Sequence, residues 1–520
     1  MSSISKPTIT PSVDHTSSSK KSATRRQIRG SSLLLAGRFL SKGINFVAQI
    51  LVVRYLSMTD YGAFAYALSI VHLGQSVATF GLDRALARFV PLYHERQDYD
   101  RFFGTLFMIV GAILSLGLAI ALSLQAFQPL TRTWIEDQQA YALLLVLIFL
   151  VPIQAIDDLL VGLFAVFANP RAIFFRRHVL APVLKLVVVL LLVLSQSTVF
   201  FLAGGYLAAS LIGVGVYVVM LLRLMHTNAL FQHFSLRTIQ VPWREVLAFT
   251  VPLLVSDLVY IVMNSMDVVM LEHFRGLAAV ASLRAQQPIA VMNQMVMASF
   301  TTLFTPLAAR MFARNDREGI NNLYWQTAIW IAVFSFPIFV LTFSAAAPIT
   351  ALLLGERYAQ SAPILALLAL GYYFNASLGF NGLTLKIYGK LRYVIIISVI
   401  TVLVNLVLNL ALIPVYGALG AALGTSLTLI LHNILKQAGL RLGTGINLFE
   451  WRYFRVYCVI LLSALGLLAI QWASDAAVYV SLPLAALASW IVFRLNRHLL
   501  AIEQTFPELL RLPLVKRLLY

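Results

Sequence analysis

Charged residues are scarce in this chain. Of its 520 residues, 12% are charged and 60% are hydrophobic, and the mean hydropathy is +0.84. These values lie far outside the range of soluble globular domains. Apolar stretches of roughly 20 residues, long enough to cross a bilayer, recur from residue 31 almost to the end. The composition therefore excludes a soluble enzyme or binding domain and predicts an integral membrane protein.

Cysteine and long polar connections are also nearly absent. The single cysteine, Cys458, lies in an apolar stretch, so an intrachain disulfide is excluded. Residues 1–30 are polar, and we expect no cleavable signal peptide. No connection between apolar stretches is long enough to hold a separate domain. The chain is therefore expected to consist of membrane helices and short loops.

The apolar stretches predict an all-α integral membrane protein with about 14 transmembrane helices. The expected spans are 31–53, 61–82, 102–124, 140–166, 173–194, 199–222, 245–271, 280–306, 322–346, 361–385, 393–413, 417–435, 456–473 and 476–493.

Positive charge is distributed unequally between the two sides of this topology. With the N-terminus inside, the tails and the even-numbered connections hold 31 of the 39 Lys and Arg residues, and the opposite side holds four. Cytoplasmic loops carry such an excess, so we expect both termini in the cytoplasm and a location in the cell membrane. The net charge of +18 then reflects topology and contact with membrane lipids, not nucleic-acid binding.

The two halves of the chain resemble each other. The tripeptide Arg96-Gln97-Asp98 after the second span recurs as Arg314-Asn315-Asp316 after the eighth, and nearby span boundaries follow the same offset. Six is an even number of spans, so the halves keep the same orientation and are expected to be related by a pseudo-two-fold axis along the membrane normal, as in transporters that work by alternating access. The predicted parts are a disordered cytoplasmic tail at 1–30, an N-lobe at 31–235, a C-lobe at 236–440, two further helices at 441–494 and an amphipathic cytoplasmic tail at 495–520.

Polar side chains form stripes on the first two spans of each half. Such residues are costly in lipid and usually face a bundle interior or a water-filled cavity. We therefore expect a cavity between the lobes. Its predicted polar lining is Asn45, Gln49, His72, Asp257, Asn264, Asp267 and Gln287, together with the cations Arg38, Lys42 and Arg284 and, at the outer mouth, Arg54.

These four cations predict an anionic substrate, because Arg and Lys hold phosphate oxygens through charge-assisted hydrogen bonds. Lys42 lies near the middle of its span, where a cation costs roughly 2.5 to 3.5 kcal/mol on insertion scales, which favours a functional role. Two structural alternatives stay open. Arg38 could extend to the cytoplasmic interface, and Arg284 could neutralise Asp267.

Oxygen-bearing side chains predict a weaker second site. Asn405 and Asn409 are spaced i, i+4 in the eleventh span, and with Asp267 they would offer carboxylate and amide ligands to a monovalent cation. The sequence does not choose between coupling to H⁺, to Na⁺ or to the membrane potential. It predicts no catalytic residue, no metal site and no organic cofactor.

Two segments resemble polysaccharide and oligosaccharide flippases, of the O-antigen type, in the MOP (multidrug, oligosaccharidyl-lipid, polysaccharide) superfamily. They are the run from Arg54 to Phe64 and the run from Leu354 to Tyr358. The resemblance implies a V-shaped pair of lobes with a cavity lined by the first, second, seventh and eighth helices. It also implies a polyprenyl-pyrophosphate-linked oligosaccharide as substrate, translocated for cell-surface polysaccharide synthesis, with a polysaccharide polymerase and glycosyltransferases as partners. Ser57 and the segment Val280 to Arg284 depart from the usual pattern.

Three other functions were weighed. A cation-coupled multidrug exporter of the same superfamily usually has twelve helices and a more acidic cavity. A membrane glycosyltransferase or polymerase would be expected to carry catalytic groups in a sizeable external loop, and the external connections here are short with few acidic residues. A scaffold would recruit enzymes through its basic C-terminal tail. The sequence thus favours a transporter over an enzyme.

Overall fold

The computed structural model is helical throughout the part that it describes. The described residues are 14–132, 135, 137–167, 170–235, 237–474 and 477–500, with side chains except at 14–32, 35, 130, 252–264 and 302. Within these ranges there are helices and loops but no strand. The all-α class expected from the apolar stretches is confirmed.

The first half of the chain forms an N-lobe. Its elements are α1 (Asp14–Tyr55), α2 (Met58–Thr79), α3 (Leu82–Glu95), α4 (Tyr99–Ala126), α5 (Gln128–Thr131), α6 (Gln138–Leu147), α7 (Leu150–Val166), α8 (Pro170–Ile173), the π-helix η1 (Phe174–Leu180), α9 (Ala181–Leu194), α10 (Val199–Thr227) and the short 3₁₀ helix η2 (Leu230–His233).

The second half forms a C-lobe and a further helix pair. The C-lobe contains α11 (Trp243–Arg275), α12 (Leu277–Val291), η3 (Met292–Gln294), α13 (Met295–Ala313), α14 (Arg317–Phe343), α15 (Ala346–Leu354), η4 (Glu356–Ser361), α16 (Ala362–Ser377), α17 (Asn381–Ile387), α18 (Leu391–Tyr416) and α19 (Ala418–Thr444). The final elements are η5 (Trp451–Tyr453), α20 (Phe454–Ser474) and α21 (Val478–Leu500).

Many of these helices are long and apolar enough to span a membrane. Among the described residues there are 10 such helices, or up to 12 if each of two bent pairs forms one span. One bent pair is α6 and α7, which meet at 43°. Pro152 lies at the start of α7 and has no N–H to continue the hydrogen bonding of α6. The count of fourteen stays a prediction, because α1 and α11 are only partly described.

The first helix differs from the expected tail. α1 begins at Asp14, so its helical backbone extends into the segment predicted to be disordered. No proline interrupts the chain between Pro11 and Pro91, which allows the helix to extend this far. Of the predicted amphipathic tail, the residues after Leu500 lie outside the described part.

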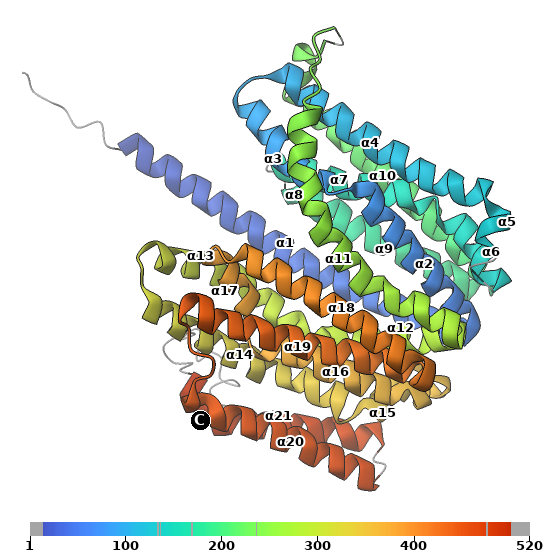
Figure 1. Cartoon of the computed structure of the whole chain (residues 1–520), viewed down its shortest axis with the longest axis vertical. Coiled ribbons are helices and arrows are strands. Elements are labelled where there is room, and N and C mark those ends of the chain that lie inside the picture. The colour runs from blue at the N-terminus through green and yellow to red at the C-terminus, as the bar shows by residue number, and fades with distance from the viewer. Residues whose placement is uncertain are drawn as a thin grey trace, which may run out of the picture.

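The two lobes lie side by side, with α1 and α11 running between them (Figure 1). The lobes meet where α2 packs on α12: a Cβ added to Gly62 would overlap the carbonyl group of Leu277. We call this the Arg54 end. At the opposite end, which we call the Asp98 end, α3 and α13 lie apart (Figure 1). The close approach at Gly62 joins α2 to α12 at the Arg54 end, whereas at the Asp98 end the C-lobe contacts α3 through α11, where Tyr93 donates a hydrogen bond of 3.0 Å to Glu245.

The repeated tripeptides form equivalent turns at the Asp98 end. Gln97 and Asn315 both adopt left-handed backbone, with φ of 57° and 56°. The next residue in each case, Asp98 or Asp316, accepts a hydrogen bond from a backbone N–H three residues later and so caps α4 or α14. The internal resemblance thus corresponds to matching turns in the two lobes.

The last two helices pack on the outside of the C-lobe. Ser344, which follows α14, donates a hydrogen bond of 2.7 Å to the carbonyl oxygen of Ala464 in α20. Phe334 of α14 contacts Phe493 of α21, with ring centroids 6.1 Å apart. Because α14 lies between them and the interior of the lobe, α20 and α21 add a peripheral layer (Figure 1).

Candidate functional site

The polar stripe of α1 lies on the helix that runs between the lobes. Arg38, Lys42 and Asn45 are exposed, and Gln49 is half-buried. Gln49 donates a hydrogen bond from its side-chain amide to the hydroxyl of Tyr61 in α2. The structure contains no ion pair of Arg38 or Lys42 with any described acid. This part of α1 therefore presents positive charge that its described neighbours leave unpaired.

Arg284 joins the two lobes through a polar contact. Its Nη2 donates to Ser69 Oγ of α2 at 3.1 Å, and its Nη1 donates to Gln287 Oε1 at 2.6 Å. Gln287 in turn lies 3.5 Å from the hydroxyl of Tyr372 in α16. The structure shows no ion pair within 4.0 Å between Arg284 and Asp267, both of which are described. Arg284 thus donates to two neutral acceptors, Ser69 and Gln287, at the α2–α12 contact.

Arg54 lies in the last turn of α1, apart from the polar stripe of that helix. Its Nε donates to the carbonyl oxygen of Leu353 at 3.0 Å, and its guanidinium also reaches Leu352. Arg357 of η4 reaches in the other direction and donates to the carbonyl oxygens of Leu56, at 2.8 Å, and of Arg54. Arg54 thus makes contacts between the lobes, and its predicted role in binding substrate stays a prediction.

His72 opens onto a polar cavity inside the N-lobe. His72 Nδ1 lies 3.3 Å from Gln75 Oε1, and Gln75 Nε2 donates to Asp158 Oδ2 of α7 at 2.8 Å. The cavity has a volume of about 320 Å³, and its walls come from α2, α7, η1, α9 and α10. His72 itself is exposed. A hydrogen-bonded path therefore leads from the surface of α2 into the lobe.

Arg176 is the important charged residue of this cavity that the sequence did not single out. Its Nη2 forms an ion pair of 2.6 Å with Asp157, and its Nε donates to the carbonyl oxygen of Gly213 at 2.7 Å. It lies on the π-helix η1, where the N–H of Ala181 bonds to the carbonyl of Arg176. Pro182 cannot donate to the preceding turn, which favours this wider helix. A π-turn in an apolar span has no clear sequence signal except the nearby proline.

Lys185 lies in the same cavity without an acidic partner within ion-pair distance. The two aspartates of α7 instead face arginines, since Asp158 lies 4.0 Å from Arg177 and Asp157 bonds to Arg176. The ammonium of Lys185 lies 5.4 Å from the centre of the Tyr206 ring. The cavity therefore combines two carboxylates with three cations, and His72 of α2 lines its wall.

Two of the predicted monovalent-cation ligands, Asn405 and Asn409, are joined by a hydrogen bond. Asn405 Nδ2 donates to Thr428 Oγ1, and Asn409 Nδ2 donates to Asn405 Oδ1, both at 3.2 Å. Asp267 is buried and accepts a hydrogen bond of 2.9 Å from the backbone of Val268. Within the described part, no hydrogen bond joins Asp267 to either asparagine, and no three His, Cys, Asp or Glu side chains are arranged to hold a metal.

Two predicted polar residues cannot be placed. The side chains of Asp257 and Asn264, in α11, lie outside the described residues.

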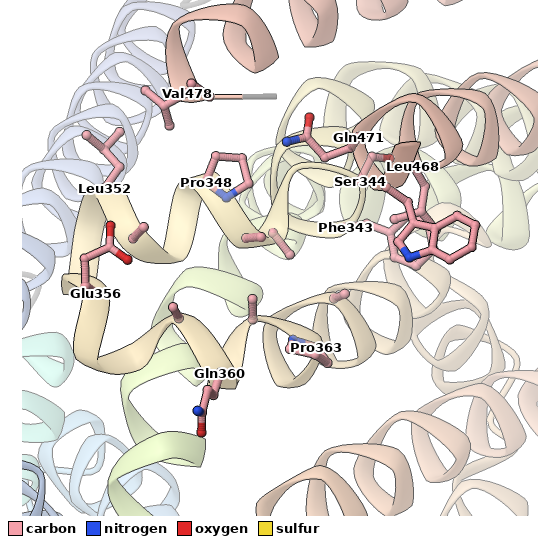
Figure 2. A pocket seen from close by; sticks show the side chains of 18 of the residues that line it. Phe343, Ser344, Pro348, Leu352, Glu356, Gln360, Pro363, Leu468, Gln471 and Val478 are labelled. Carbon is pink, nitrogen blue, oxygen red and sulfur yellow. The ribbon is translucent and has the colours of Figure 1, made fainter. Parts of the chain in front are cut away.

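A second cavity lies at the Arg54 end and is distinct from the cationic surface of α1. It has a volume of about 1030 Å³ between α15, η4 and α16 on one side and α20 and α21 on the other (Figure 2). Apart from a few side chains such as Arg54, Glu356 and Gln471, its lining is apolar. Cavity volume alone therefore does not locate the charged site, which is defined by the residues of α1, α2 and α12.

Residues 28–312 match the model of a family described as polysaccharide biosynthesis protein. The chain belongs to this family. Residues 252–411 also match the MatE model. Membership in the polysaccharide biosynthesis protein family confirms the resemblance seen in the Arg54 to Phe64 segment, and places the chain in the MOP superfamily of transporters.

Two proteins are similar to this chain in sequence. An uncharacterized membrane protein of Methanocaldococcus jannaschii is 22% identical over 414 residues, which cover 77% of this chain and 81% of that protein. The succinoglycan biosynthesis transport protein ExoT of Rhizobium meliloti is 25% identical over 351 residues, which cover 66% of this chain and 65% of ExoT.

Two solved structures share the fold of this family member. The lipid II flippase MurJ in an inward closed conformation has a TM-score of 0.71 and 15% identity, covering 90% of this chain and 99% of MurJ. An inward-facing multidrug resistance MATE family transporter of the MOP superfamily has a TM-score of 0.62 and 14% identity, covering 77% of this chain and 94% of that transporter. The two-lobe architecture is therefore that of MOP superfamily transporters.

Proposed function

We propose that this protein is a flippase that moves a polyprenyl-pyrophosphate-linked oligosaccharide across the cell membrane for surface polysaccharide synthesis. The observation that carries the proposal is the exposed cationic stripe of α1, with Arg38 and Lys42, on the helix between the lobes. A lysine in the body of a membrane helix is costly unless it faces water or an anion. A diphosphate with attached sugars supplies such an anion.

The arrangement of the lobes supports alternating access. The Arg54 end is closed by the contact between Gly62 and Leu277 and by the hydrogen bonds of Arg54 and Arg357. At the Asp98 end the lobes diverge (Figure 1). Substrate would enter from the Asp98 end, which the charge distribution assigns to the cytoplasm, and rocking of the lobes would open the Arg54 end.

The named relatives support the class of substrate. One is a succinoglycan biosynthesis transport protein, and one structural neighbour is a lipid II flippase, so both act on saccharides or saccharide-carrying lipids. A polysaccharide polymerase and glycosyltransferases would act before and after the transport step. Coupling to H⁺, to Na⁺ or to the membrane potential would drive it, with Asp267, Asn405 and Asn409 as the proposed cation ligands.

A multidrug exporter is the second candidate, favoured by the MatE match and the MATE-like fold. An acidic cavity is expected to bind drugs that are lipophilic cations. The α1 stripe and Arg284 are instead positively charged. Positive charge on these helices would repel such drugs. The flippase therefore fits the charged residues better.

Reconstitution distinguishes the two functions. Purified protein in liposomes would be given a fluorescent polyprenyl-pyrophosphate saccharide or a fluorescent lipophilic cation, each with an imposed H⁺ gradient, Na⁺ gradient or membrane potential. Protein-dependent movement of the saccharide lipid supports the proposal and identifies the coupling. Movement of the cation alone, under the same gradients, would replace it with drug export.

A further inference from the structure

A long acid-free segment of the C-lobe carries several cations. No Asp or Glu occurs between Glu356 and Glu450, a segment that contains α16, α17, α18 and α19. Lys386 lies near the end of α17, and His432 and Lys436 lie in α19. All three belong to the half of the lobe toward the Asp98 end. The helices that carry them supply no carboxylate to neutralise them.

The side chains are brought together by the packing of α17 on α19. A Cβ on Gly382 would lie 3.4 Å from both Cδ and Cε of Lys436 and 3.8 Å from its Nζ, so the lysine stem lies across α17 at this glycine. Lys386 follows Gly382 by one helical turn and therefore shares its face. His432 precedes Lys436 by one turn on α19. The charge of Lys386 acts on Lys436, and that of Lys436 acts on His432.

The position of Lys436 is not that of an ordinary interfacial lysine. It lies about 12 Å before Thr444, the last residue of α19, at 1.5 Å per residue. Its side chain is half-buried, whereas Lys386 is exposed. Within the described part, neither ammonium has a hydrogen-bond or ion-pair partner, and His432 contacts only Ser398 Oγ, at 3.5 Å. The half-buried ammonium of Lys436, close to other cations, is therefore placed to accept an anion from outside the protein.

We propose that Lys386, His432 and Lys436 form a binding site for a lipid-borne phosphoryl group on the C-lobe, separate from the cations of α1 and α12. Two ammonium groups and an imidazole can donate to several oxygens of one anion, and a diphosphate provides more oxygens than a single phosphodiester. The group would belong to the transported lipid diphosphate or to an anionic phospholipid. The first assignment rests on the proposed function, while the anion site itself does not.

Direct binding to the full-length protein in detergent tests the site. Farnesyl diphosphate and dihexanoyl phosphatidylglycerol would each be titrated and followed by calorimetry. The variants are Lys436→Gln and Lys386→Gln, and Lys436→Arg retains the charge. The matched control is Arg494→Gln in α21, which removes one positive charge elsewhere at the Asp98 end.

Removing one charge-assisted contact is expected to weaken diphosphate binding about tenfold in each glutamine variant. The diphosphate affinities of Lys436→Arg and of the Arg494→Gln control should stay within about twofold of the wild-type affinity. If the glutamine variants weakened the binding of phosphatidylglycerol about tenfold and left diphosphate binding unchanged, the site would be assigned to a phospholipid headgroup. The site would be overturned if Lys436→Gln and Lys386→Gln bound both lipids as tightly as the wild type. It would also be overturned if Arg494→Gln lost as much affinity as these two variants. Because binding is measured without transport, a failed flippase assay would leave this result intact.

Discussion

Arg54 and Arg357 each cap the end of a helix in the other lobe. Arg54, at the end of α1, donates to the last carbonyl groups of α15, while Arg357 of η4 donates to the carbonyl oxygens of Arg54 and Leu56. Unsatisfied carbonyls at a helix C-terminus carry partial negative charge, so each guanidinium is placed where it is favoured. This pair is positioned to hold the Arg54 end closed.

Replacing either arginine by alanine should open the Arg54 end more often. Each variant loses hydrogen bonds from a charged donor, and solvent exposure limits the cost to about 1 kcal/mol. Spin labels would be placed on the two lobes at this end in a Cys458→Ser background. The distances between the labels, measured by double electron–electron resonance spectroscopy, should include a larger share of long distances in the two variants. Arg275→Ala is the matched control, because Arg275 caps α18 within the C-lobe through the carbonyl oxygens of Pro414 and Val415. Equal distance distributions in all three variants would refute the reciprocal cap.

Gly62→Ala should destabilise the same end by steric overlap. The new Cβ would meet the carbonyl of Leu277, which is backbone and cannot rotate away. Overpacking of this kind costs about 1–3 kcal/mol, so the melting temperature in detergent should fall. Gly466→Ala in α20 has open space around its Cβ and should leave the melting temperature unchanged or slightly raised. A neutral Gly62→Ala would show that α2 and α12 do not pack this closely.

The ion pair of Arg176 and Asp157 should contribute strongly to N-lobe stability. The Arg176 side chain is 4% exposed, so its removal leaves Asp157 without its main partner. Arg176→Met should cost about 3–5 kcal/mol, and adding Asp157→Asn should recover part of it. Arg177→Met is the control, since Arg177 is half exposed at 4.0 Å from Asp158 and should cost at most about 1 kcal/mol. Thermal unfolding of the four proteins checks this order.

Glu450, in the loop before α20, should make stability depend on pH. Its side chain accepts hydrogen bonds of 2.6 Å from Asn447 and 3.0 Å from Asn321, which lower the pKa of Glu450 below its ordinary value of 4.5. A lowered pKa stabilises the folded protein above pH 4.5 and loses this effect as the pH falls through the folded pKa. The melting temperatures of wild type and Glu450→Gln should therefore differ at pH 7 and converge on acidification. A constant difference across this range would contradict the role of the carboxylate.

Helical class, lobe repeat and polar stripes could be predicted because they depend on local sequence. Apolar length determines which segments enter the membrane, and the tripeptide ending in Asp98 recurs because the same turn caps a helix in each lobe. The exposed position of Lys42 likewise follows from the helical face shared with Arg38. These features require no knowledge of which helices are neighbours.

The partners of charged residues could not be predicted, because they depend on packing between distant segments. Asp158, for example, accepts a hydrogen bond from Gln75 of α2 and lies near Arg177, which are partners that no local spacing indicates. Arg176 lies in a π-helix and pairs with Asp157, and neither feature has a clear local sequence signal. Arg54 was assigned to a substrate site from its sequence position alone, and its contacts with α15 emerged only in three dimensions.

The central claim is that cations between the lobes bind the anionic part of a transported lipid. The most direct test measures the transbilayer movement of a fluorescent polyprenyl-pyrophosphate saccharide in liposomes containing the wild type, Lys42→Ala, Arg284→Gln or the control Arg494→Gln in α21. The account predicts movement with the wild type and the control, and an initial rate lower by about tenfold or more in the other two, since each loses a charge-assisted contact. Normal movement in Lys42→Ala and Arg284→Gln, with both proteins correctly inserted, would contradict it.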